Sequence, residues 1–327
     1  MKTVTMIVPC FNEAEVIPLF YQEVSKVLGR CKNYSFKLLF VDDGSSDATL
    51  EILRAMAERT SSVKYISFSR NFGKEAAMLA GMRYADTEYV GIIDADLQHS
   101  PELIPHMLNA LDIEGYDVAA ARRTDRAGES KLRSFLSSRF YSVVNKTSDI
   151  NINDNSFDYR IMKRKVVDAI LSLPEHVRFS KGIFSWVGFN IKWFEHGNIE
   201  RAAGETKWSL KALLKYAFDG ILGFTTAPLR LPFWAGLFTL IVSVMLFVYG
   251  IVRLVVENAF DPTYSMLLSA ILFVGGLTFV FIGILGEYIA RSYVEIKARP
   301  VFIVSETNMD KDAQDAPGFD EAQQEQE

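Results

Sequence analysis

The sequence predicts an α/β fold, with helices on both faces of a mostly parallel sheet, followed by a hydrophobic C-terminal part. Short apolar runs alternate with amphipathic segments through the first half of the chain. Three of these runs end in polar motifs of related composition. After residue 230 there are two long runs without a charge, in a chain of 327 residues with 49% hydrophobic residues and a mean hydropathy of +0.11.

Five apolar runs have the length and composition of buried strands: VTMIVP at 4–9, KLLFVD at 37–42, VKYISF at 63–68, YVGIID at 89–94 and DVAAA at 117–121. The segments 16–28, 49–58 and 74–85 lie between them and carry apolar residues at helical spacing. Such alternation is typical of a parallel sheet covered by helices. In that architecture, ligands bind beyond the carboxyl ends of the strands.

Polar motifs stand at three of these strand ends: PCFNE at 9–13, DDGSSD at 42–47 and DADLQ at 94–98. Asp42 and Asp43 could also close a turn before Gly44, and Ser46 or Asp47 could cap the next helix. In DADLQ, carboxylates at alternate positions with a nearby amide suit a hard cation such as Mg²⁺ or Mn²⁺. An ordinary turn is the alternative, with Ser100 and Pro101 starting the helix that runs through 103–111.

The uncharged runs at 231–252 and 262–286 contain 22 and 25 residues, and each is long enough for a membrane span. Basic residues precede the first run and follow the second, so the positive-inside rule predicts that both ends face the cytoplasm. No signal peptide is expected at the N-terminus. Cys10 and Cys31 are expected to form neither a disulfide nor a zinc site.

The motifs PCFNE, VDDGSSD, RNFGKE, DADLQ and FDYR, in this order, resemble those of the A-type glycosyltransferases of family 2. With the two hydrophobic runs, the chain is similar to the polyprenyl-phosphate branch, which includes bactoprenol glucosyltransferases and dolichyl-phosphate mannose synthases. The resemblance covers roughly residues 1 to 305. It implies a GT-A (nucleotide-diphospho-sugar transferase) domain at 1–200, an interfacial segment at 201–228, two transmembrane helices within 229–292 and a cytosolic segment at 293–327 with a disordered acidic tail.

The resemblance also implies roles for residues at the strand ends. The donor nucleotide sugar would be bound by Pro9, Phe11, Glu13, Val41, Asp43, Asp94, Ala95, Arg201 and Lys207. Asp96 and Gln98 would hold Mg²⁺ or Mn²⁺ against the donor's phosphates, where the cation stabilises the charge on the leaving group. His99 is not expected to be a ligand. Asp94, Asp96 and Asp158 are the predicted catalytic residues.

RNFGKE at 70–75 is interpreted as mainly structural, with a turn at Gly73 and a helix that begins at Lys74 and Glu75. Arg70 could still reach the donor. In SFDYR at 156–160, the resemblance places Asp158 and Arg160 beside the acceptor, although Ser156 and Phe157 replace a common Gly-Asp pair. Arg160 could instead form a structural ion pair with Asp158. A phosphomonoester acceptor is already largely ionised near neutral pH, so Asp158 is expected to orient rather than to act as a base.

Basic residues are expected to meet the acceptor's phosphate, namely Arg122, Arg133, Arg178 and Lys207. Contact with anionic lipid head groups is the alternative for some of them. The segment 207–222 has lysines at four-residue spacing on one face and apolar residues on the other, so it is expected to lie in the membrane interface or to pack on the catalytic domain.

The expected activity is non-processive, inverting transfer of one hexose, glucose from UDP-glucose, to undecaprenyl phosphate at the cytoplasmic face of the inner membrane. The alternatives are another sugar, such as GlcNAc, mannose or aminoarabinose, and a membrane-anchored nucleotide-sugar sensor without catalysis. A processive polysaccharide synthase is disfavoured because the chain has two hydrophobic runs and no Gln-x-x-Arg-Trp motif. No nucleic-acid partner is expected, and the resemblance implies a homo-oligomer, a tetramer.

Overall fold

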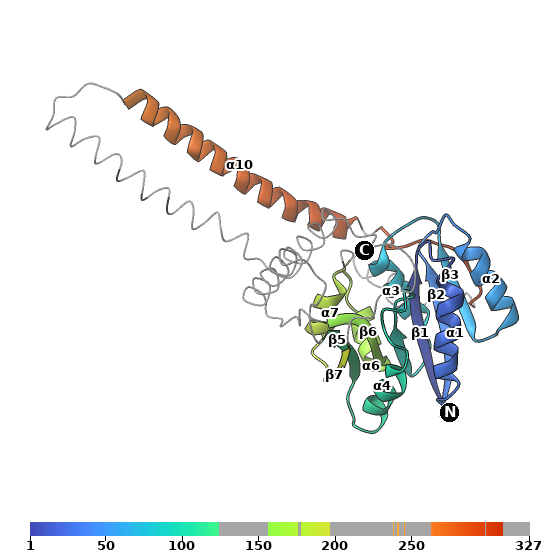
Figure 1. The fold of residues 1–327 in the computed structure, drawn as a ribbon. Helices are drawn as coiled ribbons and strands as arrows, with labels where there is room; N and C mark the ends of the chain where they lie inside the picture. The colour runs from blue at the N-terminus through green and yellow to red at the C-terminus, as the bar shows by residue number, and fades with distance from the viewer. Residues whose placement is uncertain are drawn as a thin grey trace, which may run out of the picture.

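A computed structural model describes residues 1–123, 156–175, 178–196, 263–297 and 299–309, together with positions 238, 241 and 245. In this part of the chain, eight strands form one sheet in the order β7-β5-β6-β4-β1-β2-β3-β8 (Figure 1). The strands are β1 (Lys2–Cys10), β2 (Tyr34–Asp42), β3 (Val63–Phe68), β4 (Tyr89–Ile92), β5 (Val118–Arg123), β6 (Ser156–Lys163), β7 (Ile191–His196) and β8 (Val304–Thr307).

The sheet is mostly parallel, as predicted. β1 pairs in parallel with β2 and β4, β2 with β3, and β5 with β7. β6 runs antiparallel between β4 and β5, and β8 runs antiparallel along the edge of β3. All five predicted strands are confirmed. The antiparallel strand β6 has no counterpart among them, although it contains the SFDYR motif.

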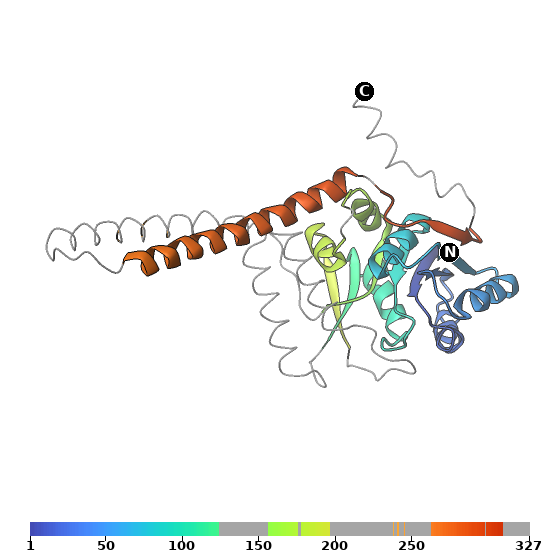
Figure 2. The ribbon, with the colours of Figure 1, turned by 90° about the horizontal axis from the view of Figure 1, so that it is seen from above.

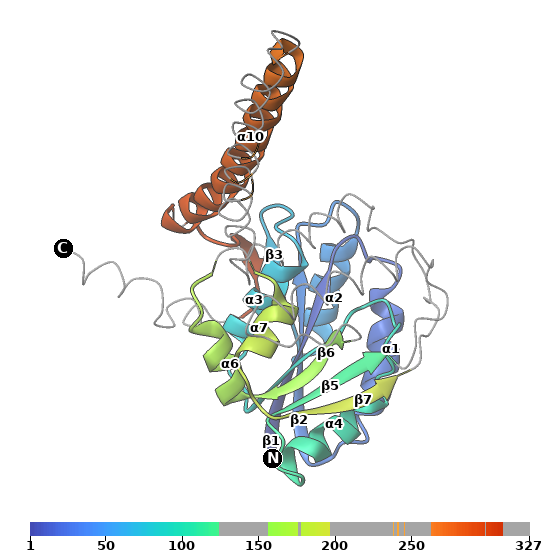
Figure 3. The same cartoon turned by 90° about the vertical axis from the view of Figure 1, so that its left-hand side faces the viewer.

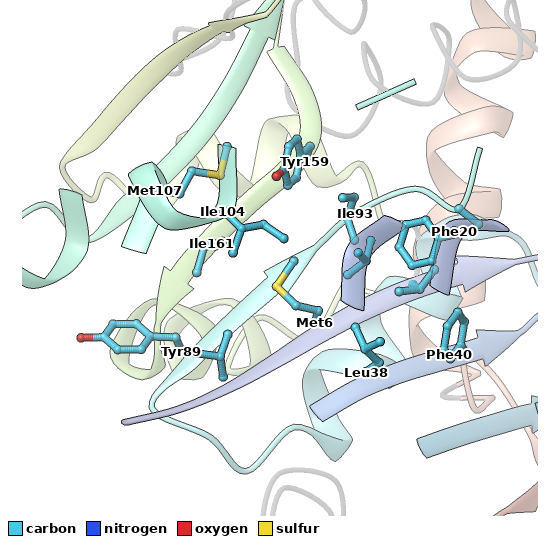
Figure 4. Close-up of a cluster of buried hydrophobic side chains, with 14 of the residues drawn as sticks. Met6, Phe20, Leu38, Phe40, Tyr89, Ile93, Ile104, Met107, Tyr159 and Ile161 are labelled. Carbon is cyan, nitrogen blue, oxygen red and sulfur yellow. The ribbon is translucent and has the colours of Figure 1, made fainter. Parts of the chain in front are cut away.

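Helices cover both faces of the sheet (Figure 3). Buried residues of α1 (Ile17–Leu28), α2 (Thr49–Arg59) and α4 (Leu103–Asp112) belong to one apolar cluster, which includes Phe20, Phe40 and Ile104 (Figure 4). Buried residues of α3 (Lys74–Tyr84), α6 (Arg164–Leu171) and α7 (Ser180–Trp186) belong to a second cluster. Two separate apolar cores, divided by the sheet, fix the strand ends that carry the polar motifs.

The start of α4 differs from the prediction. The helix begins at Leu103 and not at Pro101. The carbonyl oxygens of Ser100 and Pro101 accept hydrogen bonds from the N–H groups of Leu103 and Ile104, so a turn precedes the helix. The helix through 103–111 is confirmed, and both cysteines are free.

Further along the chain, α10 (Thr263–Ile296) extends away from the sheet domain (Figures 1 and 2). It contains residues 263–286, which are all of the second uncharged run except its first residue. Within the described ranges, no helix combines the length and apolar character needed to cross a membrane.

The chain then returns to the sheet, where β8 pairs antiparallel with β3. Glu306 of β8 pairs with Arg54 of α2 and accepts a hydrogen bond of 2.5 Å from the Tyr65 hydroxyl. The C-terminal end of α10 is therefore tied to the β3 edge of the sheet.

Several predictions concern residues outside the described ranges. They are the first hydrophobic run apart from positions 238, 241 and 245, the interfacial segment at 201–228, the acidic tail beyond residue 309, and the site residues Arg133, Arg201 and Lys207.

Candidate active site

The three acidic or amide-bearing motifs meet at one edge of the sheet. Cys10 at the end of β1 pairs with Asp42 at the end of β2, and Ile7 pairs with Ile92 at the end of β4. Because these strands are parallel, PCFNE, DDGSSD and DADLQ all leave the sheet on the same side. The structure therefore confirms that the motifs share an edge.

The first two motifs are locked together by hydrogen bonds between loops. The N–H of Asn12 donates to Ser45 Oγ at 2.8 Å, and the N–H of Ser46 donates to Asn12 Oδ1 at 2.8 Å. The N–H groups of Glu13 and Ala14 donate to Thr49 Oγ1 and Asp47 Oδ2. Asn12 has a φ of 52°, a left-handed conformation that costs energy in a non-glycine residue. The paired loops hold it there.

Asp42 and Asp43 are nearly fully buried and have clear structural contacts. Asp42 accepts hydrogen bonds from the N–H of Ser45 and from Ser67 Oγ. Asp43 accepts from the N–H groups of Phe72 and Gly73 at 2.7 and 2.9 Å. Burial raises the pKa of Asp43, although the two N–H groups lower it. Asp43 thus anchors the RNFGKE loop, and its predicted contact with the donor stays a prediction.

Gly44 permits the close approach of two loops. Its φ is +67°, and a Cβ built on it would lie 2.4 Å from the carbonyl carbon of Arg70 and 2.8 Å from the nitrogen of Asn71. Both contacts are with backbone atoms, so a larger side chain would displace the loop after β3.

The DADLQ motif forms a tight turn after β4. The N–H of Gln98 donates to Asp96 Oδ1 at 3.1 Å, and Leu97 between them has a φ of 58°. Such strain in a bulky residue is typical of functional turns. Asp96 and Gln98 are partly exposed, while Ala95 is buried. No group of three or more His, Cys, Asp or Glu side chains suited to a metal occurs among the residues that the structure describes.

Lys74 brings two of the predicted catalytic carboxylates together. Its Nζ lies 2.6 Å from Asp94 Oδ1 and 2.8 Å from Asp158 Oδ2. The lysine begins α3, Asp94 follows β4, and Asp158 lies on β6. The three side chains are 33%, 25% and 19% exposed, so the centre is open to solvent on one side.

The ammonium keeps both carboxylates ionised. Burial acts to raise the pKa of Asp94, but the Lys74 charge and the nearby His99 side chain outweigh it, and the pKa is lowered. Burial also acts to raise the pKa of Asp158, and the charges of Lys74 and Lys181 lower it below its ordinary value. Burial acts to lower the pKa of Lys74, yet Asp158 and Asp94 raise it well above its usual range.

His99 and Arg160 surround this centre. His99 is buried, its Nε2 lies 3.6 Å from Asp94 Oδ2, and its ring packs against Phe157 and Tyr159. Arg160 is 2% exposed and donates to the carbonyl oxygens of Phe157 and Asp158 at 2.9 and 3.2 Å. Its guanidinium lies 3.6 Å from the centre of the Phe184 ring. Arg160 therefore supports the backbone beside Asp158.

Glu75 lies next to Lys74 and faces α7. It accepts hydrogen bonds from the Ser180 hydroxyl and, at 3.2 Å, from the Ser180 N–H. Burial, with a smaller contribution from the Asp158 charge, raises the pKa of Glu75 to about 7.

Two of the predicted phosphate-binding arginines lie within the described ranges. Arg122, at the end of β5, pairs with Glu195 of β7 at 2.7 Å. Arg178 is 9% exposed and donates to the carbonyl oxygens of Ile170 and Leu173, both at 3.3 Å. Among the other predicted donor-binding residues, Pro9, Phe11 and Glu13 are partly exposed at the end of β1, and Val41 is buried in β2.

The sequence-based interpretation missed the central role of Lys74 and the contact of His99 with Asp94. A signal for Lys74 was present. RNFGKE follows β3, which is parallel to β2, so it also leaves the sheet at the edge of the three acidic motifs.

Comparison with known proteins identifies the family. The family model described as "Glycosyl transferase family 2" matches residues 5–171. This chain belongs to glycosyl transferase family 2. A second model, "GtrB C-terminal hairpin", matches residues 227–292. The protein is therefore a glycosyltransferase with the α/β fold of this family.

Relatives of this family 2 glycosyltransferase match nearly the whole chain. The prophage bactoprenol glucosyl transferase homolog of Escherichia coli K12 is 40% identical, over 92% of this chain and 98% of that protein. The bactoprenol glucosyl transferase of Shigella phage SfV is 41% identical, over 92% and 97% respectively. Among solved structures, glucosyl-3-phosphoglycerate synthase from Mycobacterium tuberculosis, in complex with Mn²⁺, UDP and phosphoglyceric acid, has 18% identity and a TM-score of 0.48, over 68% of this chain and 76% of that one.

Proposed function

We propose that this glycosyltransferase transfers a single glucose from UDP-glucose to a polyprenyl phosphate, undecaprenyl phosphate in a bacterial membrane. The observation that carries the proposal is the Lys74-bridged pair of Asp94 and Asp158 beside the donor motifs. It occurs in a chain 40% identical to proteins named bactoprenol glucosyl transferases. The product would be a lipid-linked sugar for modification of cell-envelope glycans such as lipopolysaccharide.

The donor is proposed to lie across the ends of β1, β2 and β4. Asp96 and Gln98 supply two hard oxygen atoms in one turn, and both side chains are partly exposed. These two protein ligands fit Mg²⁺ or Mn²⁺ that also binds the phosphates of the nucleotide sugar, since such ions often bind through one or two carboxylates plus substrate phosphates. When bound, the ion would stabilise negative charge on the departing diphosphate.

The transfer needs no proton acceptor on the protein. A phosphate oxygen of the acceptor attacks the anomeric carbon of glucose, the bond from this carbon to UDP breaks, and UDP leaves with the bonding electrons. The configuration at the carbon inverts. An acceptor phosphate with a second pKa of about 6 is mostly dianionic at neutral pH. The lowered pKa of Asp158, caused by Lys74 and Lys181 against the effect of burial, supports a role in orienting rather than in general-base catalysis.

We further propose that the enzyme resides in the plasma membrane, with two spans and with both termini and the catalytic domain in the cytoplasm. The uncharged runs of 22 and 25 residues and the flanking basic residues support this arrangement. The segment at 201–228 would lie in the membrane interface, where Arg201 and Lys207 would reach the donor and acceptor phosphates. Arg133 would reach the acceptor's phosphate. A homo-oligomer, a tetramer, is part of the same proposal.

Labelled nucleotide sugars test this function directly. The purified full chain should transfer label from UDP-glucose to undecaprenyl phosphate, and excess chelator should abolish transfer. Asp96→Ala should be inactive, whereas Asp168→Ala, which changes an exposed carboxylate on α6, should be normal. If label is transferred only from another nucleotide sugar, that sugar replaces glucose in the proposed reaction. No lipid-linked product from any common donor would favour the nucleotide-sugar sensor.

A further inference from the structure

A pocket of about 490 Å³ lies between the first turn of α3 and the C-terminal end of α10. Phe72, Glu75 and Arg178 form its wall on the sheet domain. The opposite wall comes from the last turns of α10 and the segment after it, which contribute Lys297 and Arg299. The pairing of β8 with β3 holds the chain that follows this pocket against the sheet.

The charges around this pocket are mostly positive. Three cationic side chains, Arg178, Lys297 and Arg299, line it with a single carboxylate, Glu75. Arg178 comes from one part of the chain, and Lys297 and Arg299 come together from another. The ammonium of Lys297 lies 4.8 Å from the centre of the Tyr293 ring. Converging cations of this kind favour an anion with several oxygen atoms.

The remaining walls are apolar or aromatic. Phe72, Val294 and Val301 line the pocket, and Val294 is 45% exposed on the surface of α10. A small inorganic anion would leave these side chains in water. A ligand with an anionic head and an apolar chain would use both the cations and the apolar wall.

The pocket adjoins the carboxylate centre through two consecutive residues. Glu75 lines the pocket, and Lys74 holds Asp94 and Asp158. The pKa of Glu75 is about 7, because burial and the Asp158 charge raise it against the hydrogen bonds from Ser180 and the charge of Lys74. An arriving anion would raise this pKa further, so that the protonated carboxyl would donate a hydrogen bond instead of repelling the ligand.

We infer that this pocket binds a phosphate group carried on an apolar chain. The identification of that ligand as the polyprenyl phosphate acceptor rests on the proposed function. A phospholipid head group offers the same chemistry, and inorganic phosphate offers its charged part alone. Binding measurements distinguish these three ligands.

Binding is measured by calorimetry on the full chain in detergent, without donor, using farnesyl phosphate as a water-soluble probe. The Lys297→Ala/Arg299→Ala double variant should bind it at least about tenfold more weakly than the wild type. Lys165→Ala/Lys192→Ala is the matched control, because these lysines pair with Asp117 and Glu114 outside the pocket. Farnesol and inorganic phosphate should each bind much more weakly than farnesyl phosphate.

Equal affinity of the double variant and the wild type for both farnesyl phosphate and phosphatidylglycerol nanodiscs would overturn the inference, as would equal affinity of the wild type for farnesol and farnesyl phosphate. If the double variant loses affinity for phosphatidylglycerol nanodiscs but not for farnesyl phosphate, the pocket would bind a bilayer lipid and not the acceptor. Transfer from UDP-glucose is assayed separately. If the wild type transfers glucose normally and the double variant binds both probes as well as the wild type does, the pocket is rejected and the proposed function stands. If the double variant binds more weakly but the wild type transfers no glucose, the pocket stands and the proposed function is rejected.

Discussion

The Nζ atom of Lys74 lies 2.8 Å from Asp158 Oδ2, which joins the first turn of α3 to β6 across 84 positions of sequence. The same ammonium lies 2.6 Å from Asp94 Oδ1. One cation therefore separates two partly buried carboxylates that would otherwise repel each other. The residue that determines the shape of the centre is the lysine of a motif that the sequence-based interpretation treated as structural.

Replacement of Lys74 by methionine should lower turnover by about 100-fold, because both carboxylates lose the charge that holds them in place. Turnover is measured with UDP-glucose and a prenyl phosphate. The control is Lys37→Met, which breaks an exposed ion pair with Asp86 and should leave activity and stability nearly unchanged. Normal turnover in Lys74→Met would show that the bridge is not needed for the reaction.

Gly44→Ala should reduce both activity and thermal stability. Its Cβ would overlap the backbone of Arg70 and Asn71, so the loop that leads to Lys74 would move. Gly115→Ala is a close control, since Gly115 also has a positive φ, +84°, but no atom lies within 4 Å of a Cβ built there. Both variants should lose about 1 kcal/mol from backbone strain, and only Gly44→Ala should lose activity. Equal activity in the two variants would contradict the importance of this close approach.

Much of the fold follows from local sequence patterns. The apolar runs that became β1 to β5 are bounded by turn residues, and parallel order then requires their polar ends to share one edge. The position of β6 does not follow from such patterns. Its insertion between β4 and β5 is a long-range pairing, and this pairing brings Asp158 to Lys74.

The individual roles of acidic residues were harder to predict than their location. Asp43 and Asp94 both follow strands and look alike in sequence, but Asp43 is covered by the N–H groups of Phe72 and Gly73, while Asp94 meets a lysine. No sequence pattern indicates that Arg178 donates hydrogen bonds to carbonyl oxygens near the end of α6. Such differences depend on the side chains and backbone groups that tertiary packing brings near each residue.

Phe302→Ala should loosen the attachment of the C-terminal segment to the sheet. The ring of Phe302 stacks on Phe68 with centroids 5.1 Å apart, and Phe68 contacts Phe72 of the loop before Lys74. The free energy of unfolding should fall by only about 1–2 kcal/mol, because this ring is partly buried. Turnover should fall as well. Thermal unfolding and turnover are compared with Ile303→Ala, whose side chain is 53% exposed. Similar losses in both variants would mean that the aromatic stack does not position the loop.

Asp158→Asn should lower turnover by about tenfold or more without changing the shape of the pH profile. Lys74 and Lys181 keep the pKa of Asp158 below its ordinary value against the effect of burial, so its carboxylate does not titrate near neutral pH. A fall in rate below about pH 6 should come from protonation of the acceptor's phosphate and should therefore appear in both proteins. Profiles are recorded for both on the same lipid. Disappearance of the acidic limb in the variant would identify Asp158 as a general base.

Glu75→Gln should remove a pH dependence of stability. The ordinary pKa of 4.5 is raised to about 7 in the folded protein, mainly by burial, with Asp158 also raising it and Ser180 and Lys74 lowering it. Between these two values the folded state binds more protons than the unfolded state, so the free energy of unfolding should fall as the pH rises from 4.5 to 7.

The loss across this window should be at most about 3 kcal/mol, and it should be absent below and above it. Thermal unfolding of the detergent-solubilised chain is followed at several pH values for wild type, Glu75→Gln and Glu51→Gln, the last of which changes an exposed carboxylate in the first turn of α2. Only Glu75→Gln should flatten the curve. If its midpoint falls with pH as steeply as that of wild type, the proton is held by another group, and Glu75 is already ionised beside Ser180 at neutral pH.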